Sequence, residues 1–148
     1  MKGVDGSTSA SSCTAVGEEA LKGITSGYSN TAIGKLAGAT LTTGIENIII
    51  GAETNTLASG DNNSIVIGKS ATGLGSNTTV IGNSSTTQTK LFGKLVTTTY
   101  TVATLPTGSA GSRSFVTDAL APSFGVAVAG GGAIGVPVYH DGTSWKVG

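Results

Sequence analysis

A short apolar segment that ends in glycine recurs five times in this chain, and this repeat constrains the fold more than any other feature. The closing residues are Gly17, Gly34, Gly51, Gly68 and Gly82, so successive repeats are 17, 17, 17 and 14 residues apart. A repeat of this length is typical of a solenoid, because one coil cannot bury its own hydrophobic face and packs against its neighbours instead. The sequence therefore predicts a column of stacked coils over residues 13–96.

The strand at the start of each repeat is apolar on both faces. Alternate residues of a half-exposed strand are polar, but in residues 31–33 and 65–67 neighbouring positions are both apolar. One face can fill the coil interior, and identical copies around a three-fold axis would cover the other. We expect a homotrimer, with a monomeric solenoid capped by the C-terminal domain as the alternative. The trimer core is assigned to the residues two positions before each glycine: Ala15, Ala32, Ile49, Val66 and Val80.

The rest of each repeat carries turn residues. A second glycine and an Asn-rich turn complete the coil, so we expect two short strands and two corners per coil. Stacking at the strand spacing of about 4.8 Å gives a column only about 24 Å tall. The lone Cys13 occupies the slot four residues before the glycine and is interpreted as a small repeat-position residue. The other repeats fill this slot with Asn30, Asn47, Ser64 and Thr78.

The chain beyond the repeats predicts a second, smaller unit. Residues 1–12 form a lead-in, and residues 97–148 contain expected strands at 113–118, 125–129, 136–140 and 144–147. Asp141 followed by Gly142 is a strong hairpin turn. The predicted fold class is all-β: a short trimeric β-solenoid of the β-roll or β-prism kind, followed by a small antiparallel β C-terminal domain.

Candidate ligand-binding residues gather around this hairpin. Tyr139, His140, Asp141 and Trp145 place aromatic rings beside a carboxylate, an arrangement that suits a sugar ring. We expect Tyr139 and Trp145 to form a cross-strand pair. The alternative interpretation is that Trp145 is simply the core of a small domain.

The composition argues against several other functions. Charged residues make up 11% of the chain, against about 25% in a typical protein, and the net charge is zero, which disfavours nucleic-acid binding. No run of apolar residues is long enough for membrane insertion. Any catalytic triad or metal site would rest on His140 alone, and one Cys with one His gives no zinc-ligand spacing, so we expect neither cofactor nor enzymatic activity. A depolymerase would need a carboxylate pair, and Asp118 and Asp141 both stand beside turn residues.

Two parts of the sequence resemble known families. Residues 30–37 and 63–71 resemble the head repeats of trimeric autotransporter adhesins, which also occur in bacteriophage fibres. Residues 103–106, 113–118 and 136–148 are similar to a terminal module of phage tail fibres and other virion appendages. The sequence carries no coiled-coil stalk or membrane anchor of the autotransporter kind, which favours the phage resemblance.

These resemblances imply a structural protein on the virion surface. The expected function is a homotrimeric fibre or spike that displays its C-terminal knob for attachment to host-surface glycans. Its lead-in, residues 1–12, would dock on other virion proteins of the capsid or tail. One alternative is a capsid decoration, cement or head-fibre protein without receptor binding, and another is the head fragment of a bacterial trimeric adhesin.

Overall fold

The computed structural model describes residues 11–148 and forms two compact units, the first ending at Lys90 and the second spanning Leu91–Gly148. The boundary expected between residues 96 and 97 therefore falls inside the second unit. The lead-in expected over residues 1–12, with its docking role, lies outside the described residues except for its last two positions.

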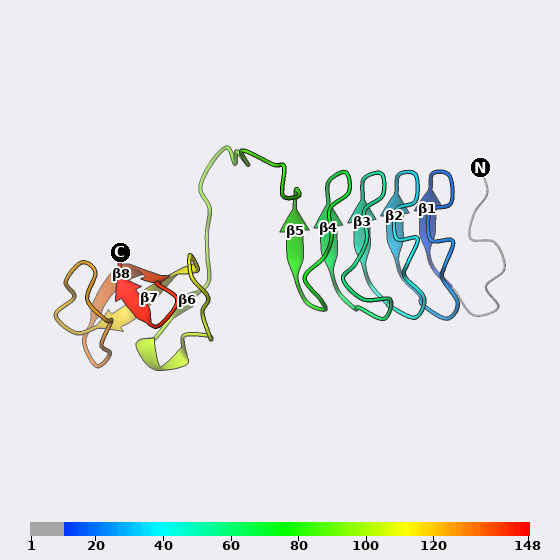
Figure 1. The fold of residues 1–148 in the computed structure, drawn as a ribbon. Helices are drawn as coiled ribbons and strands as arrows, with labels where there is room; N and C mark the ends of the chain where they lie inside the picture. Colours follow the sequence, from blue (N-terminus) through cyan, green and yellow to red (C-terminus); the bar gives the residue numbers. More distant parts are fainter. Residues whose placement is uncertain (1–10) are drawn as a thin grey trace. The chain divides into compact units, whose positions relative to one another are not determined.

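The first unit is a β-solenoid in which each coil contributes one strand to a parallel sheet (Figure 1). Equivalent repeat positions pair in exact register, so that Ala32 pairs with Ile49 and Ile49 with Val66. The all-β solenoid is thus confirmed. The second strand expected in each coil is wrong, because the rest of the coil is turn and bend apart from one bridge between Asn55 and Thr72. The strands are β1 (Thr14–Val16), β2 (Thr31–Ile33), β3 (Ile48–Ile50), β4 (Ile65–Ile67) and β5 (Thr79–Ile81).

The glycine that follows each strand lets adjacent coils approach closely. Gly34 has φ +131°, and a Cβ atom placed there would lie 2.6 Å from the carbonyl oxygen of Gly51. That distance is shorter than any real contact, so a side chain would force the coils apart. Gly82 differs, because the atoms nearest to its missing Cβ belong to Thr86 of its own coil. The close stack of glycines therefore runs through the first four repeats, at Gly17, Gly34, Gly51 and Gly68.

The corner after each of β1–β4 uses left-handed backbone at a residue other than glycine. Leu36 has φ +57° and Glu53 has φ +61°. The N–H of Leu36 donates to the carbonyl of Glu18, and the N–H of Glu53 donates to the carbonyl of Lys35, each over 2.8 Å. A left-handed residue with a side chain costs about 1–2 kcal/mol. These hydrogen bonds between coils, together with the one from the N–H of Ser70 to the carbonyl of Ala52, offset part of that cost at the corners after β2, β3 and β4.

The coil interior is a narrow aliphatic core. Ala32, Ile49 and Val66, one from each central strand, are wholly buried within the single chain. Leu21 and Leu41 reach the same core from the turns and are also wholly buried. The assignment of the middle strand residues to a trimer core is therefore wrong: their own coils already enclose Ala32, Ile49 and Val66. The two end members, Ala15 and Val80, are half-buried at the same inward position of their strands.

A ladder of buried amides runs beside this aliphatic core. The Asn30 side chain donates from Nδ2 to the carbonyl of Gly44 over 2.8 Å, and that of Asn47 donates to the carbonyl of Asp61 over 2.7 Å. Asn47 Oδ1 accepts from the backbone N–H of Ser64 over 3.0 Å. Each amide thus bonds within its own coil and to the next coil, which satisfies buried polar groups that would otherwise be costly.

The second unit is a four-stranded sheet in the order β6-β7-β8-β9. Its first pair, β6 with β7, is parallel, so the sheet is mixed instead of purely antiparallel as expected. The strand expected over residues 125–129 is also wrong: Ala127 makes only an isolated bridge to Lys146. The core contains Val116, Ala119 and Val138. The elements are β6 (Thr99–Tyr100), the 3₁₀ helix η1 (Val102–Thr104), β7 (Arg113–Ala119), β8 (Ile134–His140) and β9 (Trp145–Val147).

Candidate functional site

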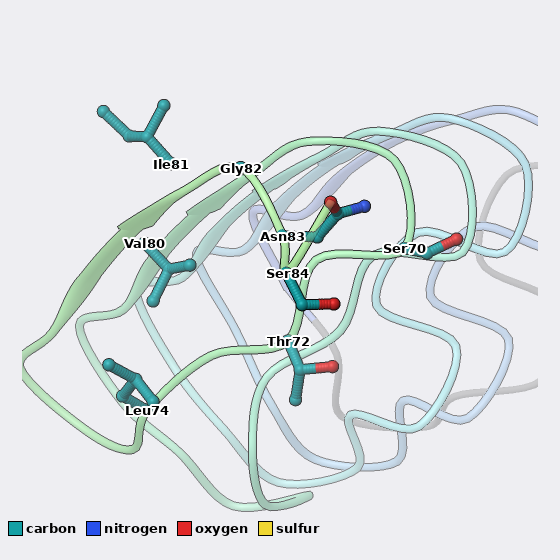
Figure 2. A pocket seen from close by; sticks show the side chains of 8 residues that line it. All are labelled: Ser70, Thr72, Leu74, Val80, Ile81, Gly82, Asn83 and Ser84. Carbon is teal, nitrogen blue, oxygen red and sulfur yellow. The ribbon is translucent and has the colours of Figure 1, made fainter. Parts of the chain in front are cut away.

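The outward-facing side of β1–β5 is a largely aliphatic surface, which we call the outer sheet face. It consists of the first and third residues of each strand, which alternate with the buried middle residue. Val16 and Ile33 are each 40% exposed, and Ile48 is 39% exposed. Figure 2 shows the alternation in the last coil, where Ile81 points away from the coil and Val80 points inward. The face is formed by Thr14, Val16, Thr31, Ile33, Ile48, Ile50, Ile65, Ile67, Thr79 and Ile81.

No position on the outer sheet face is charged. The charged groups lie in the turns instead, where Lys35 pairs with Glu18 at 2.9 Å and Lys22 pairs with Glu19 at 2.8 Å. These contacts raise the pKa of Lys35 and lower the pKa of Glu19, because each partner stabilises the ionised form. A largely aliphatic surface without charge is typical of an assembly interface.

A cavity of about 450 Å³ opens at the last coil (Figure 2). This coil is three residues shorter than the others, and Leu74 and Val80 lie at the open end of the aliphatic core. The amide of Asn83 lines the cavity but already donates to the carbonyl of Lys69 over 2.8 Å. Ser70, Thr72 and Ser84 also line the cavity, which marks the end of the coil stack.

The structure places three of the four candidate ligand residues on the two faces of the second sheet and the fourth, Asp141, in the turn between β8 and β9. His140 pairs with Trp145 in the ladder between β8 and β9, whereas Tyr139 pairs with Lys146. The expected cross-strand pair of Tyr139 and Trp145 is therefore wrong, because their side chains project from opposite faces. On its own face, Tyr139 lies between Lys146 and Arg113 of β7.

Asp141 organises the hairpin turn. Its Oδ1 accepts hydrogen bonds from the backbone N–H groups of Thr143 and Ser144, each over 2.8 Å. Its Oδ2 lies 3.5 Å from the ammonium group of Lys146. The two backbone bonds, with Lys146 as a smaller contribution, lower the pKa of Asp141. Its carboxylate is thus committed to the turn.

His140 and Trp145 meet on the core side of the sheet. Their ring centroids are 5.4 Å apart and the rings are nearly perpendicular, at 81°. The indole Nε1 donates to the carbonyl of Pro106 over 3.1 Å. Beside them lies a cavity of about 380 Å³ that both side chains line, which we call the Trp145 cavity.

The loop before β7 supplies residues that the sequence did not reveal. Pro106 and Gly108 both line the Trp145 cavity. A Cβ atom at Gly108 would lie 2.6 Å from Cδ2 of His140, so only glycine lets the imidazole pack here. Pro106 is separated from Trp145 by 39 positions along the chain, and no local pattern could have linked the two.

Within residues 11–148, no three His, Cys, Asp or Glu side chains come together as metal ligands do. The same part of the chain contains no helix of the length and apolarity that a membrane crossing requires. Comparison of the chain with protein-family models, with curated proteins and with solved structures finds no match.

Proposed function

We propose that this protein is a structural component of a bacteriophage virion, a homotrimeric fibre or spike that displays its C-terminal unit for attachment to host-surface glycans. The observation that carries the proposal is the outer sheet face. In this proposal three copies bury their outer sheet faces against one another around a common axis. The second unit of each copy then serves as the attachment knob.

The energetics support burial of this face. Fully burying a Val or Ile side chain contributes about 1.5–3 kcal/mol, and the half-exposed residues of the face would gain part of that each. Association costs several kcal/mol of lost freedom, so a single residue would not suffice. The outer sheet face has at least one aliphatic residue on each of its five strands, so its burial would gain this free energy at several positions at once. The resemblance of residues 30–37 and 63–71 to trimeric adhesin heads supports three copies in particular.

The assignment to a virion rests on the second unit. The segments that resemble the phage terminal module include β7 and the hairpin of β8 and β9. The hairpin places the Trp145 cavity next to a turn, where a surface glycan could reach it. Three such units on one trimer would strengthen weak individual contacts by avidity.

The oligomeric state tests the assembly. Light scattering coupled to size exclusion should give three times the chain mass of 14.4 kDa. Ile48→Lys places a charge on the outer sheet face and should yield monomers with unchanged circular dichroism. Leu57→Lys is the matched control, because Leu57 is 63% exposed but lies in a turn outside the strands, and it should remain trimeric. A monomeric wild type, or a trimeric Ile48→Lys variant, would overturn the proposed interface.

The location of the protein in a particle tests the virion role. A cryo-EM map of a phage whose genome encodes this chain should contain three-fold density for a short column with three terminal knobs. Density on the tail, together with binding of the labelled trimer to host cells, is the expected result. Density on the capsid, without cell binding, would favour the decoration or cement alternative.

A further inference from the structure

His140 presents one unused hydrogen-bond donor. The side chain is only 9% exposed, and its Nδ1 accepts a hydrogen bond from the backbone N–H of Gly142 over 3.1 Å. An accepting Nδ1 places the ring proton on Nε2, which is then a donor. No residue in the described part of the chain accepts from Nε2, and every fully enclosed side-chain nitrogen or oxygen there has a partner. Nε2 therefore keeps some contact with solvent and is not fully enclosed.

The imidazole is held rigidly in place. The Trp145 ring packs against it at 81°, and the Gly108 backbone lies against Cδ2, the ring carbon bonded to Nε2. The hydrogen bond from the indole Nε1 to Pro106 fixes Trp145 in turn. A donor that is fixed by its surroundings binds an acceptor with little loss of conformational freedom.

The Trp145 cavity has the chemical character of a site for a neutral sugar. Its volume of about 380 Å³ lies within the range of about 300–1,000 Å³ that small-ligand sites occupy. Besides the two rings, it is lined by aliphatic groups such as Leu105 and Val128 and by the hydroxyl-bearing residues Thr107 and Thr143. None of its lining residues is an Asp, Glu, Lys or Arg, so it has no charged group to pair with a carboxylate or phosphate.

We propose that the Trp145 cavity binds one residue of a neutral saccharide. The His140 Nε2–H donates to a hydroxyl or ring oxygen of the sugar, and Trp145 with the aliphatic lining contacts its C–H face. The hydroxyls of the threonines complete the polar contacts at the rim. This inference deepens the proposed attachment function and rests on it for its biological role.

Nuclear magnetic resonance of the full chain labelled with ¹⁵N-histidine tests the site directly, because the chain has one histidine. The probes are glucose, galactose, mannose, N-acetylglucosamine and N-acetylgalactosamine, with the carboxylate sugar N-acetylneuraminic acid as the charged comparison. At least one neutral probe should shift the Nε2 resonance saturably, with a Kd on the order of 1–10 mM, as expected for a single small contact. A tighter response to N-acetylneuraminic acid, or no saturable response to any neutral probe, would overturn the proposal.

A matched pair of variants separates His140 from the surrounding fold. His140→Asn keeps a side-chain acceptor near the Nδ1 position but lacks the Nε2 donor, and it should weaken binding at least tenfold, measured by the fluorescence of Trp145. Tyr139→Phe lies on the opposite face of the sheet and should bind as the wild type does. Equal binding by His140→Asn would refute the role of Nε2. If His140→Asn does not fold, the Nε2 resonance of the wild type still decides the question.

Cell binding distinguishes this site from the wider proposal. If the wild-type trimer binds host cells and His140→Asn binds them equally, the site is wrong and the attachment function stands. If the neutral sugar occupies the cavity but the trimer does not bind cells, the attachment function is wrong and the site stands.

Discussion

Asn30 Oδ1 accepts hydrogen bonds from both the backbone N–H and the side-chain amide of Asn47, each over 3.0 Å and one full coil away. Both side chains are wholly buried. Since a slip of one residue would leave both amides unpaired in the core, this contact fixes which residues of adjacent coils stack. The aliphatic positions alone would tolerate neighbouring registers.

Removal of one ladder residue should destabilise the first unit strongly. Asn47→Ala leaves the carbonyl of Asp61 and the N–H of Ser64 unsatisfied in the interior. We expect a loss of about 2–4 kcal/mol in the free energy of unfolding, because each such group costs about 1–3 kcal/mol. Far-UV circular dichroism during denaturant unfolding measures it. Thr42→Ala, which removes only an exposed side-chain bond to the carbonyl of Ser59, should cost less than about 0.5 kcal/mol, and equal losses would contradict the ladder.

Extension of the ladder by one residue should stabilise the protein. Cys13 occupies the first slot, where its thiol lies 3.8 Å from the carbonyl of Gly27 and gives Asn30 no amide oxygen to bond. Cys13→Asn would supply both the donor and the acceptor, and we expect a gain of about 1 kcal/mol in the free energy of unfolding. Cys13→Ser supplies only the short hydroxyl and should change little. An asparagine variant less stable than the serine variant would show that the first coil does not continue the ladder.

Filling the glycine stack should force the coils apart. Gly34→Ala introduces a Cβ atom 2.6 Å from the carbonyl oxygen of Gly51, at a residue with φ +131°. Overpacking costs about 1–3 kcal/mol and left-handed backbone costs about 1–2 kcal/mol, so we expect the free energy of unfolding to fall by about 2–5 kcal/mol. Gly60→Ala is the control in the same unit, since its Cβ would meet only the movable hydroxyl of Thr43 at 3.2 Å. It should change the unfolding midpoint far less, and similar midpoints for both variants would argue against the close stack.

The stability of the second unit should depend on the ionisation of Asp141. Its pKa is lowered in the folded state, so the ionised form contributes stability above the ordinary aspartate range. That contribution is lost as the pH falls through the lowered folded-state pKa. Trp145, the sole tryptophan, reports unfolding of this unit by fluorescence. Asp141→Asn keeps the Oδ1 acceptor without the charge, so the free energy of unfolding should depend less on pH in the acid range. If that dependence is unchanged, it arises from other carboxyl groups.

The sequence predicted the position of every solenoid strand but not which face is inside. Ala32 and Ile33 are both apolar, and a strand of three residues has too short an alternation to distinguish them. The structure resolves the question through Leu21 and Leu41, which fill the interior from the turns and leave room only for the middle residue of each strand. The small side chains of Ala15 and Ala32 were the one indication of a crowded interior.

The corners and the C-terminal site show two other limits. Leu36 and Glu53 adopt left-handed backbone because of hydrogen bonds between coils, and their residue types give no hint of it. The hairpin at Asp141 was predicted correctly from its turn residues. The strand register of this hairpin nevertheless differs by one residue from the expected one. Trp145 is therefore on the same face of the sheet as His140, and Tyr139 is on the other face.

The last two strands show how such a column can change over generations. β4 and β5 stay in register, with Val66 opposite Val80, although the coil between them is three residues shorter than the rest. The height of the column therefore depends on the number of coils, whereas the length of each coil only alters the turns. Deletions or insertions in the turns can reshape the flank of the rod while its length stays constant. Gain or loss of a whole repeat would change its length by one step of about 4.8 Å.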